Sequence, residues 1–316
     1  MCENTVHPSK TVFLVGFPRS GTTWLGKLYD SHPDTVYRHE PFGREYSSFG
    51  IELYRKIKFG KEISRGERIH VVQTLIRALP NTSKPPFFRK SYRFLHAPRV
   101  ESALWSSAKF GRIPAAVYQS LYTPRRGSPV LVVKETASDV VVRGAISSIK
   151  PDKVILIIRH PYEVIASHVV GVKSGKLPLS TPEDRLQWID VHPDLAQHRE
   201  AILGMSEVEF LAFVWRVQNE SYLNFRCDQM TVLYESLVRD SQDQIDKLLQ
   251  FSGLEMHRQV EAFIQSSTRG SSADYFSVYK KRSANGWRLI LTDEDISKID
   301  GHAASLCAQL GLSLSE

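Results

Sequence analysis

Cysteine is scarce in this chain, and long apolar runs are missing. Its three cysteines, Cys2, Cys227 and Cys307, are widely spaced and odd in number. This pattern argues against a disulfide framework and against a zinc site. No apolar run reaches the roughly 18–20 residues that span a bilayer. The first ten residues also lack the basic-then-apolar order of a signal peptide.

These absences favour a soluble protein in a reducing, cytoplasmic setting, without stable membrane insertion. A fragment of a membrane-anchored enzyme that lacks its anchor would have the same composition, so the location is an expectation only. Clusters of Cys, His, Asp or Glu with metal-ligand spacing are also missing, and we expect no metal site.

Acidic residues are sparse in one part of the chain, residues 51–100. Twelve lysines and arginines stand there against three glutamates, a net charge of +9, whereas the whole chain carries +7. This excess of positive charge could attract anionic ligands, or it could simply form a solvated basic face, and the two interpretations are equally good. The basic residues are Arg55, Lys56, Lys58, Lys61, Arg65, Arg68, Arg77, Lys84, Arg89, Lys90, Arg93 and Arg99.

Apolar runs of strand length alternate with helical patterns along the chain. The predicted strands cover residues 11–16, 130–134, 153–159 and 231–234. The predicted helices cover residues 22–31, 161–172 and 237–251. This alternation predicts an α/β fold, with a parallel β-sheet flanked by helices. We expect a single domain over residues 1–316, with insertions at about 42–129 and 173–205.

A glycine-rich turn follows the first predicted strand. Residues 16–23 read Gly-Phe-Pro-Arg-Ser-Gly-Thr-Thr and lead into a predicted helix. A helix N-terminus offers free N–H groups and the positive end of a dipole, so it binds phosphate. The spacing is that of a P-loop, but Thr22 stands where an ATP-cleaving loop has lysine. The cation of the present loop is Arg19. A P-loop kinase or NTPase therefore fits poorly.

Residues 17–25 resemble the 5′-phosphosulfate loop of the sulfotransferases that use 3′-phosphoadenosine-5′-phosphosulfate (PAPS). The arginine at position 19 resembles the carbohydrate, tyrosylprotein and many bacterial members, in which arginine is more usual at this place. Many cytosolic small-molecule members have lysine there instead. The resemblance extends over about residues 11–311 and implies the sulfotransferase form of the P-loop NTPase-like fold. It also implies that the phosphosulfate and the adenine are bound by Arg19, Ser20, Gly21, Thr22, Thr23 and Trp24.

A second motif follows the strand predicted at 153–159. Arg159 lies at its carboxyl end, and Ser167 lies about two turns into the next helix. An arginine and a hydroxyl suit a dianionic phosphate. Their spacing resembles the 3′-phosphate motif of the same family, which implies PAPS as co-substrate and its desulfated form, PAP, as product.

Two weaker matches accompany these motifs. Residues 233–237, Leu-Tyr-Glu-Ser-Leu, resemble a family segment whose tyrosine, here Tyr234, lies near the adenine. Residues 280–288 resemble a late basic loop that closes over the 3′-phosphate. They depart from its usual form, so any of Lys280, Lys281 and Arg282 could contact the phosphate.

The acceptor must lose a proton, so a base is expected near the sulfuryl group. Residues 134–136 resemble the Lys-Thr-His segment of cytosolic members, but Thr136 replaces the catalytic histidine. Glu40 occupies the place of the catalytic glutamate in tyrosylprotein and some carbohydrate members. His39 and Glu135 are alternative bases, and Glu40 could instead be a structural partner of Arg19 or Arg38.

The expected reaction is in-line sulfuryl transfer from PAPS to a hydroxyl or amine, with Glu40 as base and Arg19 and Lys134 as stabilising cations. The family needs no metal. The two insertions would shape the acceptor site, and small-metabolite, carbohydrate and lipid acceptors all stay open, with a preference for anionic ones. A nucleic-acid partner is not expected. A non-catalytic module that binds polyanions is the remaining alternative, and the oligomeric state cannot be predicted.

Overall fold

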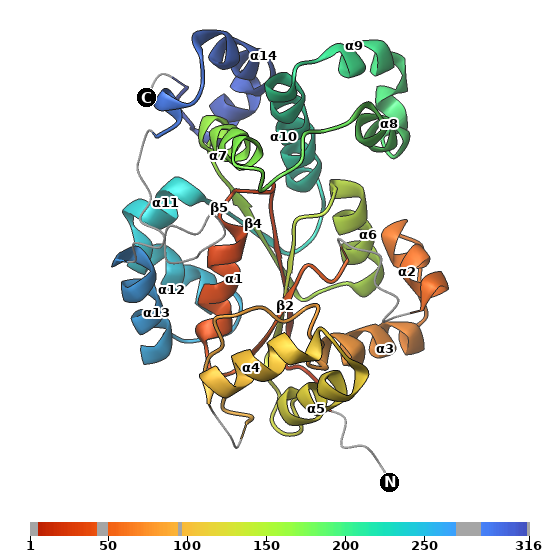
Figure 1. Ribbon diagram of the computed structural model, residues 1–316, viewed down its shortest axis with the longest axis vertical. Helices are drawn as coiled ribbons and strands as arrows, with labels where there is room; N and C mark the ends of the chain where they lie inside the picture. Colours follow the sequence, from red (N-terminus) through yellow and green to blue (C-terminus); the bar gives the residue numbers. More distant parts are fainter. Residues whose placement is uncertain (1–5, 43–49, 94–96, 270–285, 315–316) are drawn as a thin grey trace.

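The computed structural model describes residues 6–42, 50–93, 97–269 and 286–314. Within this part of the chain, five parallel strands form one sheet in the order β2-β3-β1-β4-β5 (Figure 1). The strands are β1 (Thr11–Val15), β2 (Thr35–His39), β3 (Val130–Glu135), β4 (Lys153–Ile158) and β5 (Gln229–Leu233). The predicted α/β fold with a parallel sheet flanked by helices is confirmed.

Helices fill most of the connections between the strands. The α-helices are α1 (Thr22–Ser31), α2 (Ile51–Lys58), α3 (Arg65–Ile76), α4 (Pro98–Ala108), α5 (Arg112–Tyr122), α6 (Asp139–Ile149), α7 (Pro161–Lys173), α8 (Pro182–Asp190), α9 (Arg199–Gly204), α10 (Glu207–Leu223), α11 (Tyr234–Arg239), α12 (Ser241–Phe251), α13 (Arg258–Arg269) and α14 (Asp293–Leu310). Two short 3₁₀ helices are η2 (Pro193–His198) and η3 (Gly286–Leu289).

The middle strand, β1, fixes where the site lies. It pairs with β3 on one side and with β4 on the other, so that Val15 lies beside Glu135 and Leu156. After β1 the chain crosses to the β2 edge, returns through β3, and then passes over β1 to β4. Parallel sheets bind ligands at the carboxyl ends of their strands, where the strand order reverses. The turn after β1 opens into that position.

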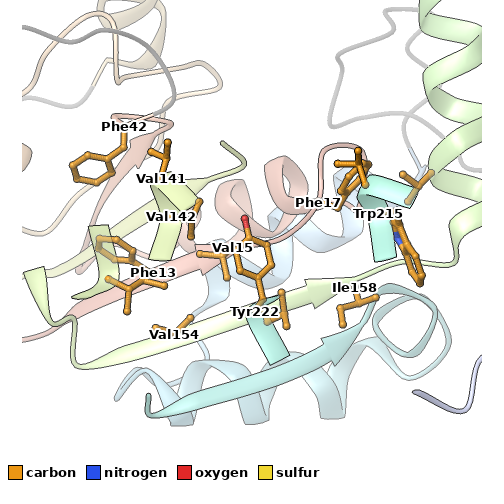
Figure 2. Packing of buried hydrophobic residues seen from close by; sticks show 14 of the residues in the cluster. Phe13, Val15, Phe17, Phe42, Val141, Val142, Val154, Ile158, Trp215 and Tyr222 are labelled. Carbon is orange, nitrogen blue, oxygen red and sulfur yellow. The ribbon is translucent and has the colours of Figure 1, made fainter. Parts of the chain in front are cut away.

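The sheet is buried on both faces, as a parallel sheet requires. Side chains of one strand alternate between the two faces, so Val12 and Leu14 pack with α1, α12 and α13, whereas Phe13 and Val15 pack on the opposite side. Figure 2 shows this second core, in which Val142 of α6 and Trp215 of α10 lie over the strands. Helices on both sides therefore hold the strand ends rigidly in place.

Most predicted elements are found within one or two residues of their expected bounds. The helix at Thr22–Ser31 agrees at both ends. Two predictions are wrong in detail. The helix expected at 237–251 is two helices, α11 and α12, because the chain changes direction at Asp240. The last strand ends at Leu233, and Tyr234 begins α11 instead.

Strand β2 was not predicted from the sequence. Its five residues include Arg38 and His39, and an arginine is rarely buried unless it is paired. Arg38 is nevertheless buried, because its guanidinium donates hydrogen bonds to the carbonyls of Leu75 (2.5 Å) and Ile76 (2.6 Å) at the end of α3. These hydrogen bonds to α3 therefore compensate for burial of the Arg38 charge, which made this segment look unlike a strand.

The two regions interpreted as insertions contain helices of their own. The first supplies α2 to α5, and the second supplies α8, η2 and α9. Figure 1 shows α4 and α5 at the lower end of the molecule and α8 and α9 at the upper end. Among the described helices, none is long and apolar enough to cross a membrane.

Candidate active site

The turn between β1 and α1 has an unusual backbone. Arg19 has φ 72°, and Gly21 has φ 95° and caps α1 without a side-chain hydrogen bond. A Cβ atom on Gly21 would lie 2.6 Å from the ring of Tyr234, and one on Gly16 would lie 2.5 Å from the carbonyl oxygen of Ile157. Both positions therefore require glycine. The turn is held tightly against β4 and α11.

The N-terminus of α1 is suited to bind an anion. Its first turn has no acidic residue, and the N–H groups there have no side-chain acceptor from the cap. Ser20 is fully buried, and no residue in the described part of the chain hydrogen-bonds its Oγ. A buried hydroxyl without a partner is costly, which is consistent with a ligand that supplies the missing partner. These features fit a phosphosulfate group in the turn.

The structure brings the two predicted phosphate motifs together. Arg19 Nε donates a hydrogen bond to Ser167 Oγ on α7 at 3.1 Å, across 148 residues of sequence. Arg159 follows β4 and donates from Nη1 to the carbonyl oxygen of Arg19 at 3.2 Å. Its guanidinium also lies 4.7 Å from the ring centre of Tyr234 and pairs with Glu163 at 2.8 Å. Two arginines and a serine thus lie around one turn.

The aromatic residues predicted near the adenine lie on two sides of this turn. Tyr234 packs against Gly21 from the start of α11. Trp24, in the first turn of α1, donates from its indole N–H to Ser267 Oγ at 3.0 Å and packs near Phe263, both on α13. The residues Lys280, Lys281 and Arg282 lie outside the described part of the chain, so their contribution stays a prediction.

The predicted base and its lysine meet at the ends of β2 and β3. His39 lies beside Lys134 in the sheet, and the Glu40 N–H donates to the carbonyl oxygen of Lys134 at 2.7 Å. The buried ammonium of Lys134 pairs with Glu40 Oε1, and Thr136 Oγ1 donates to the same oxygen at 2.8 Å. Glu40 is therefore paired with Lys134, and the structure shows no ion pair with Arg19 or Arg38 among the described residues.

The backbone of Glu40 is strained. Its φ is 50°, a conformation that residues other than glycine adopt rarely. Among the described residues, Arg19, Glu40 and Lys150 share this feature, and the first two lie in the candidate site. Strained residues are found most often where function requires one particular side-chain position.

Electrostatics separates the three candidate bases. Burial alone would raise the pKa of Glu40, but the charge of Lys134, together with smaller contributions that include hydrogen bonds from Lys134 and Thr136, lowers the pKa to about 2. Burial and then Lys134 lower the pKa of His39 to about 2, so this imidazole is neutral at physiological pH. Burial raises the pKa of Glu135 to about 7.

Glu135 is nevertheless placed as a structural group. It is fully buried, and its carboxylate accepts hydrogen bonds from the N–H groups of Phe42 (2.8 Å), Thr136 (2.9 Å) and Ala137 (3.1 Å). These bonds tie the end of β3 to the end of the segment after β2. Among the described residues, the ion pair of Lys134 is with Glu40 and not with Glu135. Glu40, which is partly exposed, is the better placed base.

One cation near the site was not predicted from the sequence. Lys84 lies in the first insertion, and its pKa is lowered by burial and then by the charge of Lys134, with Arg19 also contributing. No hydrogen bond or ion pair joins its ammonium to another described residue. Only its basic composition and the prolines at 85 and 86 marked this segment, and neither feature indicates a site.

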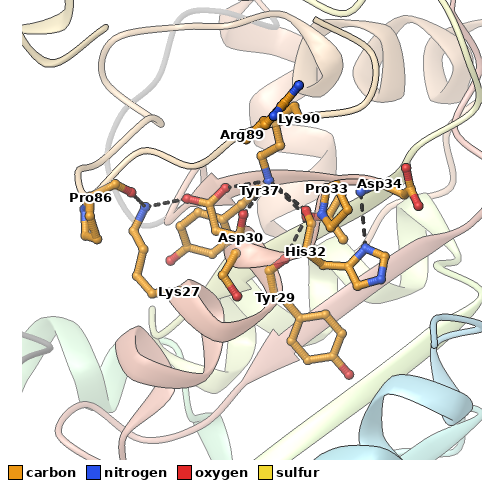
Figure 3. A network of polar contacts seen from close by, with 12 residues as sticks. Lys27, Tyr29, Asp30, His32, Pro33, Asp34, Tyr37, Pro86, Arg89 and Lys90 are labelled. Carbon is orange, nitrogen blue, oxygen red and sulfur yellow. Dashed lines mark hydrogen bonds and ion pairs between the residues drawn. The ribbon is translucent and has the colours of Figure 1, made fainter. Parts of the chain in front are cut away.

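Figure 3 shows the polar network between α1 and the segment that contains Pro86 and Lys90, just after Lys84. Lys27 of α1 pairs with Asp30 and donates to the backbone carbonyls of Lys84 and Pro86. Lys90 is buried as well and pairs with Asp30 at 3.0 Å. The basic region 51–100 is therefore only partly a solvated face, because Lys90 is internal and Arg93 pairs with the buried Glu101 at 2.7 Å.

The site described above is suited to bind anionic groups at the carboxyl edge of an α/β sheet. Residues 11–258 of the chain match the profile of the Sulfotransferase family. The chain belongs to this family, and the class of reaction is transfer of a sulfuryl group. No curated protein sequence matches the chain significantly.

Solved structures of sulfotransferases resemble the chain at low identity. The sulfotransferase domain of the Synechococcus PCC 7002 olefin synthase is 15% identical, covers 94% of this chain and 96% of its own, and has a TM-score of 0.46. The sulfotransferase domain from the curacin biosynthetic pathway is 16% identical over 98% and 99% of the two chains (TM-score 0.48). Mouse SULT7A1, complexed with PAP, is 14% identical over 96% and 87% (TM-score 0.47).

Proposed function

We propose that this sulfotransferase uses PAPS and transfers its sulfuryl group to a hydroxyl or amine of an acceptor, with Glu40 as the general base. The observation that carries the proposal is the meeting of Arg19, Ser167 and Arg159 around the open N-terminus of α1, beside the Lys134–Glu40 pair. One arrangement thus offers two anion sites and an acid–base group.

The chain's own residues fit the two ends of the nucleotide. The turn at residues 16–21 would hold the 5′-phosphosulfate, and its Ser20 hydroxyl has no hydrogen-bond partner among the described residues. Arg159 and Ser167 would hold the 3′-phosphate, since a guanidinium and a hydroxyl match its charge and geometry. The ring of Tyr234 and the indole of Trp24 would pack near the adenine.

Bound PAPS supplies an electrophilic sulfuryl group and a phosphate leaving group. Glu40 takes the proton of the acceptor hydroxyl or amine as the new bond to sulfur forms, and the phosphate leaves on the opposite side of the sulfur. Arg19 and Lys134 stabilise the negative charge that develops on the sulfuryl and phosphate oxygens. The products are the sulfated acceptor and PAP.

The Lys134–Glu40 ion pair is the resting form of this acid–base group. A carboxylate with a pKa of about 2 is a weak base, and the cause of that low pKa is the Lys134 ammonium. When Lys134 instead neutralises sulfuryl oxygens, Glu40 loses its counter-charge and its pKa rises, because desolvation is then unopposed. The same lysine would thus activate the base at the time the donor is bound.

The acceptor itself is proposed only by class. The charge of Lys84 interacts with those of Lys134 and Glu40, so we assign its ammonium to the acceptor side, where it would favour a small metabolite or carbohydrate that carries an anionic group. The two insertions would shape the rest of this side. No feature of the described site favours nucleic acid as a partner. We also propose that the enzyme acts as a soluble protein in the cytoplasm.

Transfer of labelled sulfate tests this proposal. The purified chain is incubated with [³⁵S]PAPS or with [γ-³²P]ATP and with panels of alcohols, amines, sugars and lipids. We expect labelled product from PAPS with at least one acceptor class and none from ATP. Phosphoryl transfer from ATP would instead establish a P-loop kinase. Tight, steeply salt-dependent binding of polyanions without turnover of either donor would establish a non-catalytic binding module.

A further inference from the structure

The helical hairpin formed by α4 and α5 has one face packed on the protein and one face in solvent. On the packed face, Tyr118 and Tyr122 of α5 form a small core with Ala108 of α4 and Ala78. Trp105 of α4 donates its indole N–H to the carbonyls of Pro80 (2.8 Å) and Ser83 (2.9 Å). The hairpin is therefore anchored through its inner face, and this anchor adjoins the segment that carries Lys84.

The outer face is strongly apolar. Ile113, Val117 and Leu121 follow one another at four-residue spacing along α5, which places them on a single stripe. Their exposed fractions are 80%, 42% and 54%, and Phe110, just before the helix, is 90% exposed. Val100 of α4 adds a fifth exposed side chain, at 53%. Single exposed apolar residues are ordinary, but a continuous stripe with such protruding side chains indicates an interaction surface.

Basic residues accompany this stripe, and exposed acids do not. Residues 97–128 contain one acidic residue, Glu101, which is buried and paired with Arg93 at 2.7 Å. The exposed charges of the same segment are all positive, and they belong to Arg99, Lys109, Arg112, Arg125 and Arg126. The surface thus combines protruding apolar side chains with a net positive charge that nothing on the hairpin opposes.

We propose that the outer face of α4 and α5 docks on the surface of an anionic lipid bilayer. An amphipathic element with large apolar side chains and flanking Lys and Arg residues binds at the headgroup boundary, and each of its two features contributes. The apolar stripe enters the acyl boundary, and the cations attract the phosphate and carboxylate groups of the lipids. This is adsorption from one side, and it requires no membrane-spanning helix.

Docking through this face would orient the molecule. Figure 1 shows the hairpin at the end of the molecule that is opposite to α9 and α14. The hairpin is also joined to the Lys84 segment through Trp105. The bilayer would therefore lie on the side of the first insertion. The proposal rests on the surface of the hairpin alone and does not depend on which donor or acceptor the enzyme uses.

Flotation with lipid vesicles tests the proposal on the full chain. Vesicles of phosphatidylcholine alone and vesicles with 40% phosphatidylserine are compared at about 0.1 M salt, where surface charges are still felt. We expect the wild type to float with the anionic vesicles only. The double variant Phe110→Ser/Ile113→Ser keeps every charge and should bind at least about tenfold more weakly, because the buried apolar area is lost.

Two further variants make the result specific. Lys109→Gln/Arg112→Gln should also weaken binding, and its difference from the wild type should shrink as salt is raised, because salt screens the charges that the variant lacks. The control Leu179→Ser/Val238→Ser removes two apolar side chains that are 58% and 63% exposed elsewhere, and it should bind as the wild type does. Equal binding of Phe110→Ser/Ile113→Ser and wild type would overturn the proposal, since net charge alone would then explain adsorption. The proposal would also be overturned if the wild type did not bind the vesicles but formed dimers, and if Phe110→Ser/Ile113→Ser were monomeric.

Discussion

The two sides of the candidate site are built in different ways. The proposed nucleotide side uses residues within or next to two short motifs, and guanidinium hydrogen bonds to a hydroxyl and to a backbone carbonyl join Arg19, Ser167 and Arg159. The proposed acceptor side uses Glu40, Lys84 and Lys134, which come from three separate parts of the chain and interact through charge. A fixed ligand can be recognised by local motifs, whereas proton transfer requires charges whose balance changes when the ligand arrives.

The largest expected difference between the two sides comes from Glu40→Gln. The substitution keeps the shape of the side chain and removes its basicity, so kcat should fall by roughly 10²–10⁴, the usual contribution of a general base. Affinity for PAP should barely change, since the nucleotide is held on the other side. Turnover with labelled PAPS and calorimetry with PAP measure the two quantities on one preparation.

Arg19→Ala is the matched contrast, because it should reduce both turnover and PAP affinity. The base would be a different residue if Glu40→Gln kept near wild-type turnover while His39→Ala or Glu135→Gln was inactive. If all three variants stay active, the acceptor enters without needing a protein base, as a neutral amine would.

A smaller effect is expected from Lys84→Met, which keeps the length of the side chain and removes its charge. If Lys84 attracts an anionic acceptor, kcat/KM for that acceptor should fall by about tenfold, as loss of one charge contact does, while PAP affinity stays the same. Lys61→Met, an exposed lysine of the same basic region, serves as the control. An unchanged kcat/KM would limit the acceptor side to Glu40 and Lys134.

The smallest effect is expected in the pH profile. Glu40 and His39 both have a pKa of about 2. At Glu40 the charge of Lys134 and the hydrogen bonds from Lys134 and Thr136 contribute to overcoming the effect of burial, and at His39 burial and Lys134 act in the same direction. A depressed pKa leaves Glu40 ionised and His39 neutral throughout pH 5–8. The plot of kcat/KM for PAPS against pH should therefore have no acid limb in this range, since this quantity reports the enzyme without bound donor. An acid limb near pH 6.5 would show that a histidine controls the rate.

The difference between the two sides also explains what the sequence could predict. The fold was predictable because strands β1, β3 and β4 are apolar runs, and the two candidate phosphate motifs could be located because they follow β1 and β4 in the sequence. The Lys84 contribution could not be predicted, since it depends on how a proline-rich insertion packs on Lys27. The strand that delivers Glu40 was hidden for a similar reason, because Arg38 is satisfied by carbonyls of α3.

The central claim is that the chain binds a nucleotide with a 3′-phosphate, and competition between PAP and ADP tests it most directly. Titration calorimetry on the wild type should give tighter binding of PAP than of ADP by more than about tenfold, because charge-assisted hydrogen bonds to the 3′-phosphate are strong. Arg159→Ala should remove most of this preference and leave ADP affinity nearly unchanged. Equal affinity of the wild type for PAP and ADP, or a preference that persists in Arg159→Ala, would contradict the account.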